Sequence, residues 1–317
     1  MHEPDVYIHI GLSKCASTYL QKNIFPAIGN YSDIAFSPDE DKYYLFRSDM
    51  DTEQYLQIVA RHIKNPQPKS NWLMISCEDY TELLFKGFTD VFFQWKTIRN
   101  DKYQFSNEII TENIARAYPK ARIIIVIREQ LDWVISRYKM IYRGGKTALS
   151  IDELLSEPLE GYDIMIERYQ KRFGKENVLV LPLEMMRHDH NGFIKLITSF
   201  IGTGATITAP ESQVNVSPDF KHTVEYERLK NRWRLNIRHA LWLTPPLQFI
   251  LQATARLLVA FLKPFFILRY GSSKYEITLS IETIERLKPL LENCNSRVEK
   301  LTGLDLSRYG YLVDNNR

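Results

Sequence analysis

Four short runs of apolar, largely β-branched residues mark the first 183 residues of this 317-residue chain, and patterns typical of helices separate them. The runs lack the strict alternation of polar and apolar residues of a half-exposed strand, which indicates strands covered on both faces. Strands alternating with helices predict a doubly wound parallel α/β sheet flanked by helices. Strands are expected at 6–10, 72–76, 121–127 and 178–183, and helices at 18–28, 51–64, 107–118, 131–142 and 162–173. In such sheets ligands bind outside the C-terminal strand ends, so functional residues are expected there.

The last third of the chain has a different character. A loop with Gly, Thr and Pro spans 202–218, and helical patterns then occupy 223–243, 247–262 and 280–301. We expect one domain over residues 1–317, with an α/β core in 1–205 and a helical C-terminal part in 206–317. The sequence alone does not decide whether the later helices complete this domain or form an appended lobe.

The composition is that of an ordinary globular protein, with 44% hydrophobic and 25% charged residues, which excludes disordered and collagen-like chains. Three cysteines, Cys15, Cys77 and Cys294, are too few and too scattered for a disulfide framework or a cysteine-based zinc site. Because the N-terminus is acidic and no long apolar run follows it, we expect a cytoplasmic protein.

Positive charge is concentrated in one segment, 228–275, which contains nine basic residues and no acidic ones. Subtracting these nine from the net charge of +3 leaves −6 for the rest of the chain. Such asymmetry indicates an anionic partner for this segment. The basic residues are Arg228, Lys230, Arg232, Arg234, Arg238, Arg256, Lys263, Arg269 and Lys274.

Segment 228–275 is also rich in apolar residues, but it has no run of about 20 of them, so a transmembrane span is not expected. Basic residues beside Trp242, Phe249 and Phe261 fit a helix pair lying peripherally on an anionic membrane surface. The alternatives are a buried helical hairpin with snorkelling Lys and Arg side chains, and a cleft for an anionic glycan. Nucleic acid is not expected as a partner, because no recognition motif accompanies the charge.

The expected first strand runs into a loop of small residues and then a helix, reading HIGLSKCASTYLQ over residues 9–21. Backbone N–H groups of such a turn bind anions, and here Lys14 adds a charge while Ser17 and Thr18 add hydroxyl donors. The triphosphatase P-loop, GxxxxGK[ST], would place its lysine at position 17. In this chain the lysine stands at position 14 instead, which favours a phosphate-binding loop but disfavours a triphosphate ligand. The alternative is a tight turn with an exposed lysine.

The run 121–127 leads directly into Arg128 and then into a helix that carries Ser136. A guanidinium at a strand end and a hydroxyl on the second turn of the next helix can converge on one anion, and the forked guanidinium suits phosphate. The alternative for Arg128 is an ordinary ion pair at the strand end.

Together these loops resemble those of the PAPS-dependent sulfotransferases, particularly the bacterial and carbohydrate-type branch (PAPS is 3′-phosphoadenosine-5′-phosphosulfate). There the first loop reads HIGxxKxG[ST]TxLQ, and the second is an apolar strand, RxP and a Ser eight residues after the Arg. The chain departs at Ala16, which replaces a glycine, and at Gln130, which replaces a proline and is expected only to alter the turn. Similarities at 178–184, 200–202 and 301–311 extend the resemblance over nearly the whole chain. The matching residues are His9, Ile10, Gly11, Lys14, Ser17, Thr18, Leu20, Gln21, Arg128 and Ser136.

The resemblance implies a P-loop-like fold and transfer of a sulfuryl group from PAPS, without a metal, to an acceptor hydroxyl that we expect on a carbohydrate or glycolipid. It implies that Lys14 stabilises the leaving phosphate and that Arg128 and Ser136 bind the 3′-phosphate. The 5′-phosphosulfate is expected to be bound by Gly11, Lys14, Cys15, Ala16, Ser17 and Thr18.

A general base is expected just after the strand at 72–76, where Glu78 and Asp79 follow Cys77. Carbohydrate-type members commonly use a glutamate near this point, so Glu78 is the expected base and Asp79 the second choice. The alternative for Glu78 is a helix-capping or ion-pairing role. His9 is expected to line the site without a catalytic role.

Two other functions fit parts of the sequence. A P-loop small-molecule kinase would bind ATP with magnesium and be indifferent to a 3′-phosphate. A non-catalytic peripheral membrane or interaction protein would retain the fold and bind no cofactor.

Overall fold

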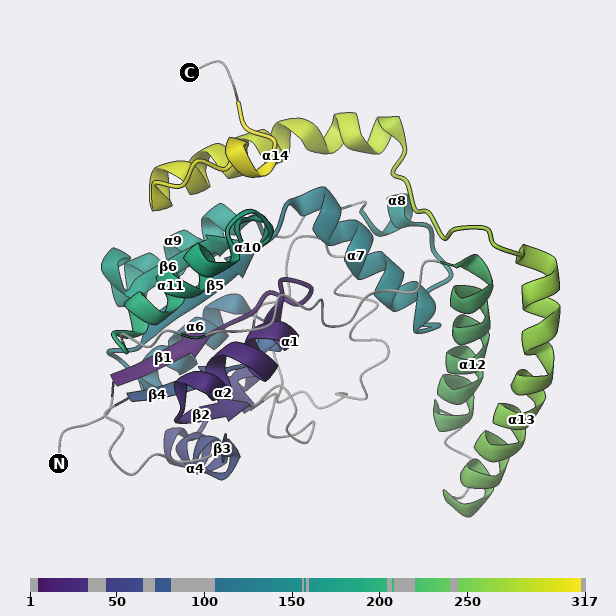
Figure 1. Ribbon diagram of the computed structural model, residues 1–317. Coiled ribbons are helices and arrows are strands. Elements are labelled where there is room, and N and C mark those ends of the chain that lie inside the picture. Colours follow the sequence, from purple (N-terminus) through teal and green to yellow (C-terminus); the bar gives the residue numbers. More distant parts are fainter. Residues whose placement is uncertain are drawn as a thin grey trace.

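The computed structural model describes residues 5–33, 44–64, 72–80, 106–155, 157, 160–203, 207, 220–239 and 245–314, and a six-stranded sheet forms the centre of its α/β body (Figure 1). The strand order is β3-β2-β4-β1-β5-β6, and all neighbours are parallel except β3, which runs antiparallel to β2. The chain extends the sheet on both sides of β1, so the predicted doubly wound fold is confirmed. The strands are β1 (Asp5–His9), β2 (Tyr31–Asp33), β3 (Ile63–Lys64), β4 (Trp72–Ser76), β5 (Arg122–Ile127) and β6 (Val178–Pro182).

The strands β2 and β3 are not predicted from the sequence, because three and two residues are too few to show a pattern. β3 takes the last two residues of the helix predicted at 51–64. That helix, α4 (Thr52–His62), begins at Asp51, whose side chain accepts a hydrogen bond from the Gln54 N–H group. It ends where Ile63 adopts an extended conformation and pairs with β2.

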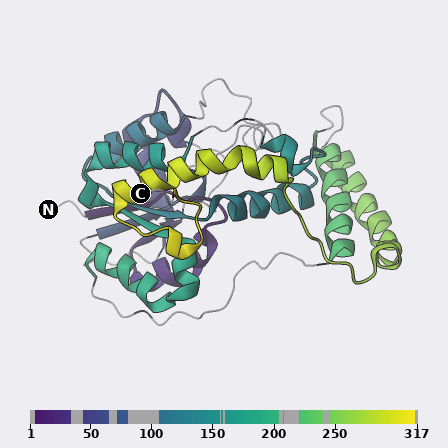
Figure 2. The same ribbon diagram turned by 90° about the horizontal axis from the view of Figure 1, so that it is seen from above.

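Helices cover both faces of the sheet, with α6 and α9 on one face and α1, α2 and α11 on the other (Figure 2). The remaining short elements connect these layers. The body helices are α1 (Ser17–Tyr19), which continues through η1 (Leu20–Ile24) into α2 (Phe25–Ile28), α6 (Asn107–Ala117), α7 (Gln130–Arg143), α8 (Ile151–Leu154), α9 (Tyr162–Phe173), α10 (Leu183–His188) and α11 (His190–Ile201). Single turns lie at η2 (Tyr44–Phe46), η3 (Glu78–Tyr80), η4 (Lys175–Asn177) and η5 (Ser307–Tyr309).

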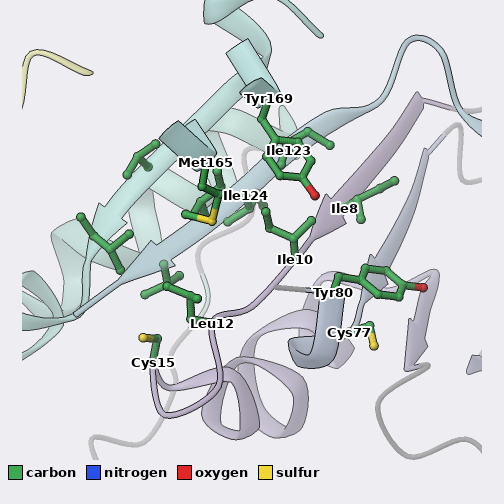
Figure 3. Packing of buried hydrophobic residues seen from close by; sticks show 14 of the residues in the cluster. Ile8, Ile10, Leu12, Cys15, Cys77, Tyr80, Ile123, Ile124, Met165 and Tyr169 are labelled. Atoms are coloured by element: carbon green, nitrogen blue, oxygen red, sulfur yellow. The ribbon is translucent and has the colours of Figure 1, made fainter. Parts of the chain in front are cut away.

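The core lies between the sheet and these helices. Ile123 and Ile124 of β5, Ile8 of β1, and Met165 and Tyr169 of α9 all belong to this core (Figure 3). All five side chains are fully buried. Covering on both faces is the physical reason for the uninterrupted apolar run in β5. The rigid central strands hold the loops at their C-terminal ends.

A helical hairpin stands away from this body, at one end of the molecule (Figures 1 and 2). It consists of α12 (Lys221–His239) and α13 (Pro245–Tyr270), which pack against each other, and α12 also contacts α7. Many apolar side chains of α13 are exposed, so the alternative of a buried hairpin is wrong. α13 runs through Pro264, well past the predicted end at 262, at the loss of one backbone hydrogen bond. Among the described residues, no helix has the length and apolar character needed to cross a membrane.

The helix α14 (Ile281–Thr302) returns to the body and packs against α9. It also forms a buried amide pair with α7, in which Gln130 Nε2 donates to Asn295 Oδ1 at 2.5 Å. Gln130 therefore does more than alter the turn, because it joins the helix after β5 to the C-terminal part of the chain. The division into 1–205 and 206–317 stays a prediction.

Candidate functional site

The loop after β1 is a tight turn with three residues at positive φ: Gly11 at 105°, Lys14 at 68° and Ala16 at 60°. The Ser17 hydroxyl closes it by donating to the Leu12 carbonyl oxygen at 2.9 Å. The family pattern has a glycine where Ala16 stands, and the left-handed backbone at this position explains that preference. This chain keeps the same loop with an alanine in a strained conformation.

The loop divides its side chains between the interior and the surface. Ser17 and Cys15 are buried, whereas Lys14, Ala16 and Thr18 are half-buried. Because burial raises the pKa of the Cys15 thiol, this group is held neutral, as expected for a packing cysteine. The Cys15 N–H group donates to the Leu12 carbonyl oxygen at 3.2 Å, as the Ser17 hydroxyl does at 2.9 Å. Ser17 can therefore offer an anion only its backbone N–H group.

Glu78 lies directly against this loop. A Cβ atom added to Gly11 would come within 2.6 Å of the Glu78 carbonyl oxygen, so only glycine fits here. The approach is fixed because the Cys77 N–H group donates to the His9 carbonyl at 3.0 Å, which continues the β1–β4 pairing past the strand ends. The backbone of Asp79 lies in the same turn, η3, and its side chain lies outside the described part of the structure.

The helix α7 supports the loop from the other side. Trp133 Nε1 donates to the Ser13 carbonyl oxygen at 2.8 Å, and the buried Arg137 donates to Ser13 Oγ at 2.9 Å. Arg128, at the end of β5, donates to the Lys14 carbonyl oxygen at 3.4 Å and forms an ion pair of 3.6 Å with Asp132. The ion pair considered for Arg128 is therefore present beside its contact with the loop.

These contacts gather four cations around one loop. The pKa of Lys14 is lowered, first by burial and then by the positive charges of Arg143, Arg137 and Arg128, while Glu78 acts in the opposite direction. Arg128 and Arg143 also pair with Asp132 and Glu227, whereas Lys14 is still crowded by like charges, so an added anion would favour its charged form. The buried Arg128 Nε atom, which has no hydrogen-bond partner among the described residues, points to the same need.

Ser136 is half-buried on the second turn of α7. Its neighbour Arg137 and the more distant Arg143 were not predicted as site residues. A sequence signal exists for Arg143, because it lies seven residues after Ser136 and therefore on the same helix face. Arg137 could not be found in this way, because its role depends on contact with Ser13 across the loop.

His9 is fully buried, so it lies beneath the site instead of lining it. Its Nδ1 atom is 2.8 Å from Ser76 Oγ, which also accepts a hydrogen bond of 3.1 Å from Gln21 Nε2. Burial lowers the His9 pKa to about 3, so the ring is neutral at physiological pH. His9 and Gln21 thus tie β1, β4 and the helix after the loop together.

The carboxylates of Glu129 and Glu184 hold the start of α7 in place. The Glu129 side chain caps α7 by accepting from the N–H groups of Leu131 and Asp132. The Glu129 N–H group donates to Glu184 Oε1 at 3.1 Å, and the buried Tyr311 hydroxyl donates to Glu184 Oε2 at 2.9 Å. Glu184 therefore has a structural role, as it joins α10 to the start of α7 and to the C-terminal segment.

Within the described residues, no group of three or more His, Cys, Asp and Glu side chains is arranged to hold a metal ion. The residues brought together are Lys14, Glu78, Arg128, Arg137 and Arg143. Such a set can bind an anion, stabilise developing negative charge and accept a proton at one carboxylate.

Comparison with known proteins identifies the family and the fold of the chain. The sequence profile of the sulfotransferase family matches residues 10–206, which include both loops and Glu78. No curated protein sequence matches the chain. The crystal structure of a sulfotransferase from Alicyclobacillus acidocaldarius is similar, with a TM-score of 0.54 and 14% identity over 98% of this chain and 100% of that one. The structure of mouse sulfotransferase SULT7A1 complexed with PAP has a TM-score of 0.41 and 11% identity over 96% of this chain and 91% of that one.

The family profile thus covers more than half of the chain, and the solved bacterial structure has the same fold over nearly its whole length. The two loops predicted from the sequence lie side by side at the C-terminal edge of the sheet, where this fold places its ligands. The chain belongs to the sulfotransferase family.

Proposed function

We propose that this protein transfers a sulfuryl group from PAPS to an acceptor hydroxyl, carried by a carbohydrate or glycolipid. The observation that supports this most is the cluster of Lys14, Arg128, Arg137 and Arg143 around the loop after β1. PAPS carries several negative charges, and its 3′-phosphate distinguishes it from ATP. The lowered pKa of Lys14 and the unpartnered Arg128 Nε atom fit a site that is completed by such an anion.

The roles of the binding residues follow from where each of them lies. Backbone N–H groups of residues 11–18, other than those of Leu12 and Cys15, which donate to carbonyl oxygens of the protein, would hold the 5′-phosphosulfate together with the Lys14 side chain. Arg128 and Ser136, from the β5 end and α7, would hold the 3′-phosphate. Arg137 would act as a positioning residue, because it contacts Ser13 and so fixes the loop against α7.

Two side chains would carry the chemistry, for which PAPS supplies the sulfuryl group. Lys14 would stabilise the negative charge that develops on the leaving phosphate as the bond to sulfur breaks. Glu78 would accept the proton of the attacking hydroxyl, since it lies beside the same loop. The proton then resides on the Glu78 carboxylate and returns to solvent after the sulfated product leaves.

Calorimetric titration tests the binding part of the proposal. We expect 3′,5′-ADP to bind more tightly than 5′-ADP, which lacks the 3′-phosphate, and more tightly than ATP with magnesium. Arg128→Ala should remove most of this preference, whereas Arg172→Ala, which changes an exposed arginine of α9 paired with Glu112, should leave it intact. Tighter binding of ATP would favour the kinase alternative, and no binding of any nucleotide would favour a non-catalytic protein.

Transfer of labelled sulfate from PAPS to a panel of glycans and glycolipids tests the chemical part. Glu78→Gln should lower the transfer rate by about 10²–10⁴-fold without weakening 3′,5′-ADP binding. Asp79→Asn is the matched variant one residue away. Loss of transfer in Asp79→Asn with normal transfer in Glu78→Gln would make Asp79 the base.

A further inference from the structure

The outer face of α13 carries a stripe of exposed apolar side chains. The spacings between its members are seven, four, four and three residues, so the side chains share one face of the helix. All of them are between 54% and 86% exposed, which is unusual for large apolar residues. We call this set the α13 stripe; it comprises Ile250, Leu257, Phe261, Phe265 and Leu268.

The stripe is not the surface through which the hairpin holds together. The opposite face of α13 packs on α12, where the rings of Phe266 and Tyr226 have centroids 6.3 Å apart and Lys221 Nζ lies 5.3 Å from the centre of the Tyr270 ring. In both views α13 is the outermost element and α12 lies between it and the body (Figures 1 and 2). The stripe therefore faces away from the protein.

The charged residues of the hairpin indicate the kind of partner that the α13 stripe can bind. Glu225 and Glu227, the acidic residues of α12, are engaged with α7: Glu225 accepts from the Tyr142 hydroxyl at 2.8 Å, and Glu227 lies 3.4 Å from Arg143. Beyond them, every charged residue up to residue 275 is basic. Exposed cations include Arg232, Arg234, Lys263, Arg269 and Lys274.

We propose that the α12–α13 hairpin docks this protein on an anionic lipid bilayer. The α13 stripe would enter the interface between headgroups and acyl chains, and the surrounding lysines and arginines would contact lipid phosphates. With 26 residues, α13 is about 39 Å long, so a large apolar face can lie flat on the membrane. The hairpin of a second copy is a poorer partner, because two positively charged hairpins repel each other.

Close contacts at the base of the hairpin connect α12 to α7, so the orientation of the hairpin on a membrane would also orient the body. Arg228 donates to the Tyr142 hydroxyl at 2.6 Å and lies 4.0 Å from the centre of its ring. Tyr142 stacks between Tyr138 and Tyr275, with centroid distances of 5.6 and 5.7 Å. A Cβ atom on Gly145 would come within 2.7 Å of the Arg232 backbone nitrogen, so α12 rests directly on the turn after α7. Docking would thus orient α7, which also supports the loop after β1.

Co-sedimentation of the full-length protein with vesicles tests the proposal. We expect binding to phosphatidylcholine vesicles that contain phosphatidylglycerol, weaker binding at high salt, and little binding to phosphatidylcholine alone. The double variant Phe261→Asp/Leu268→Asp should partition more than about tenfold more weakly, because two exposed apolar anchors are lost. Its melting temperature and its affinity for 3′,5′-ADP should not change, which separates this test from the proposed transferase activity.

The matched control is Ile281→Asp/Leu290→Asp, which places the same charges on exposed apolar positions of α14. It should sediment with the vesicles as the wild-type protein does. Absence of wild-type binding to anionic vesicles at low salt would overturn the proposal, as would equal binding of the two double variants. A dimer in sedimentation equilibrium that Phe261→Asp/Leu268→Asp dissociates, without vesicle binding, would instead make the stripe an interface between copies.

Discussion

Around the loop after β1, four cations lie in one partly buried cluster, whereas on the α12–α13 hairpin the cations are exposed among exposed leucine and phenylalanine side chains. In the body, hydrogen bonds to Ser13 and to the Lys14 carbonyl hold the arginines at fixed positions. On the hairpin, water and salt screen the charges. The body is therefore suited to an anion of defined shape, and the hairpin to an extended anionic surface.

The two regions are connected through α7. Arg143 lowers the pKa of Lys14 and also forms an ion pair with Glu227 of α12. One helix thus carries Trp133 and Arg137, which contact the loop after β1, and at its C-terminal end Arg143, which contacts the hairpin. Each prediction below therefore compares a variant in the body with a matched variant in the hairpin.

Among the variants that compare the two regions, the largest effect is expected for removal of a lysine charge. Lys14→Met should lower sulfuryl transfer by about 10²–10³-fold, because a donor placed for the transition state is lost. The melting temperature should not fall, since the lost charge lies among three like charges. Lys263→Met, on the exposed surface of α13, should leave the transfer rate to a soluble acceptor unchanged. Equal losses in both variants would abolish the distinction between the regions.

A smaller effect concerns the pH dependence of stability. Because the His9 pKa is lowered to about 3, the unfolded chain binds a proton below pH about 6.5 that the folded protein does not bind. The free energy of unfolding should therefore fall as pH decreases, by about 2 kcal/mol between pH 6.5 and 4.5 from this group. Urea unfolding across this range should show a shallower pH dependence for His9→Asn.

His222→Asn is the matched change in the hairpin, where the His222 Nδ1 atom lies 2.9 Å from the Gly271 carbonyl oxygen. An equal flattening of the pH profile in that variant would show that burial in the body is not the cause.

The smallest effect is expected for replacement of an alanine by glycine, which should change the free energy of unfolding in opposite directions in the two regions. Ala16→Gly should stabilise the protein by up to about 1 kcal/mol, because the alanine has a φ of 60°. Ala260→Gly, at an exposed position inside α13, should destabilise it by about 1 kcal/mol, because glycine is a poor helix former. Thermal unfolding of both variants measures the difference. Destabilisation by Ala16→Gly would mean that the loop tolerates alanine without strain.

Much of the body follows from local patterns in the sequence. The helix predicted at 162–173 and the strand predicted at 72–76 have the same bounds in the structure. Lys14 and Arg128 stand out because each follows a strand, and the ends of parallel strands meet at one edge of the sheet. The strands β2 and β3 were missed because their extended conformation comes from pairing with neighbours and not from their own residues.

The sequence by itself determined the doubly wound sheet, the two loops at its C-terminal edge and the separation of charge between body and hairpin. These are encoded in periodicity and in residues close together along the chain. Only the tertiary structure decided that Arg137 and Arg143 join Lys14, that Ser17 closes its own loop, and that the apolar side of α13 faces outward. The first depends on contacts between residues far apart in sequence, the second on the backbone conformation of the loop, and the third on the face through which a helix packs. Local sequence patterns specify none of these.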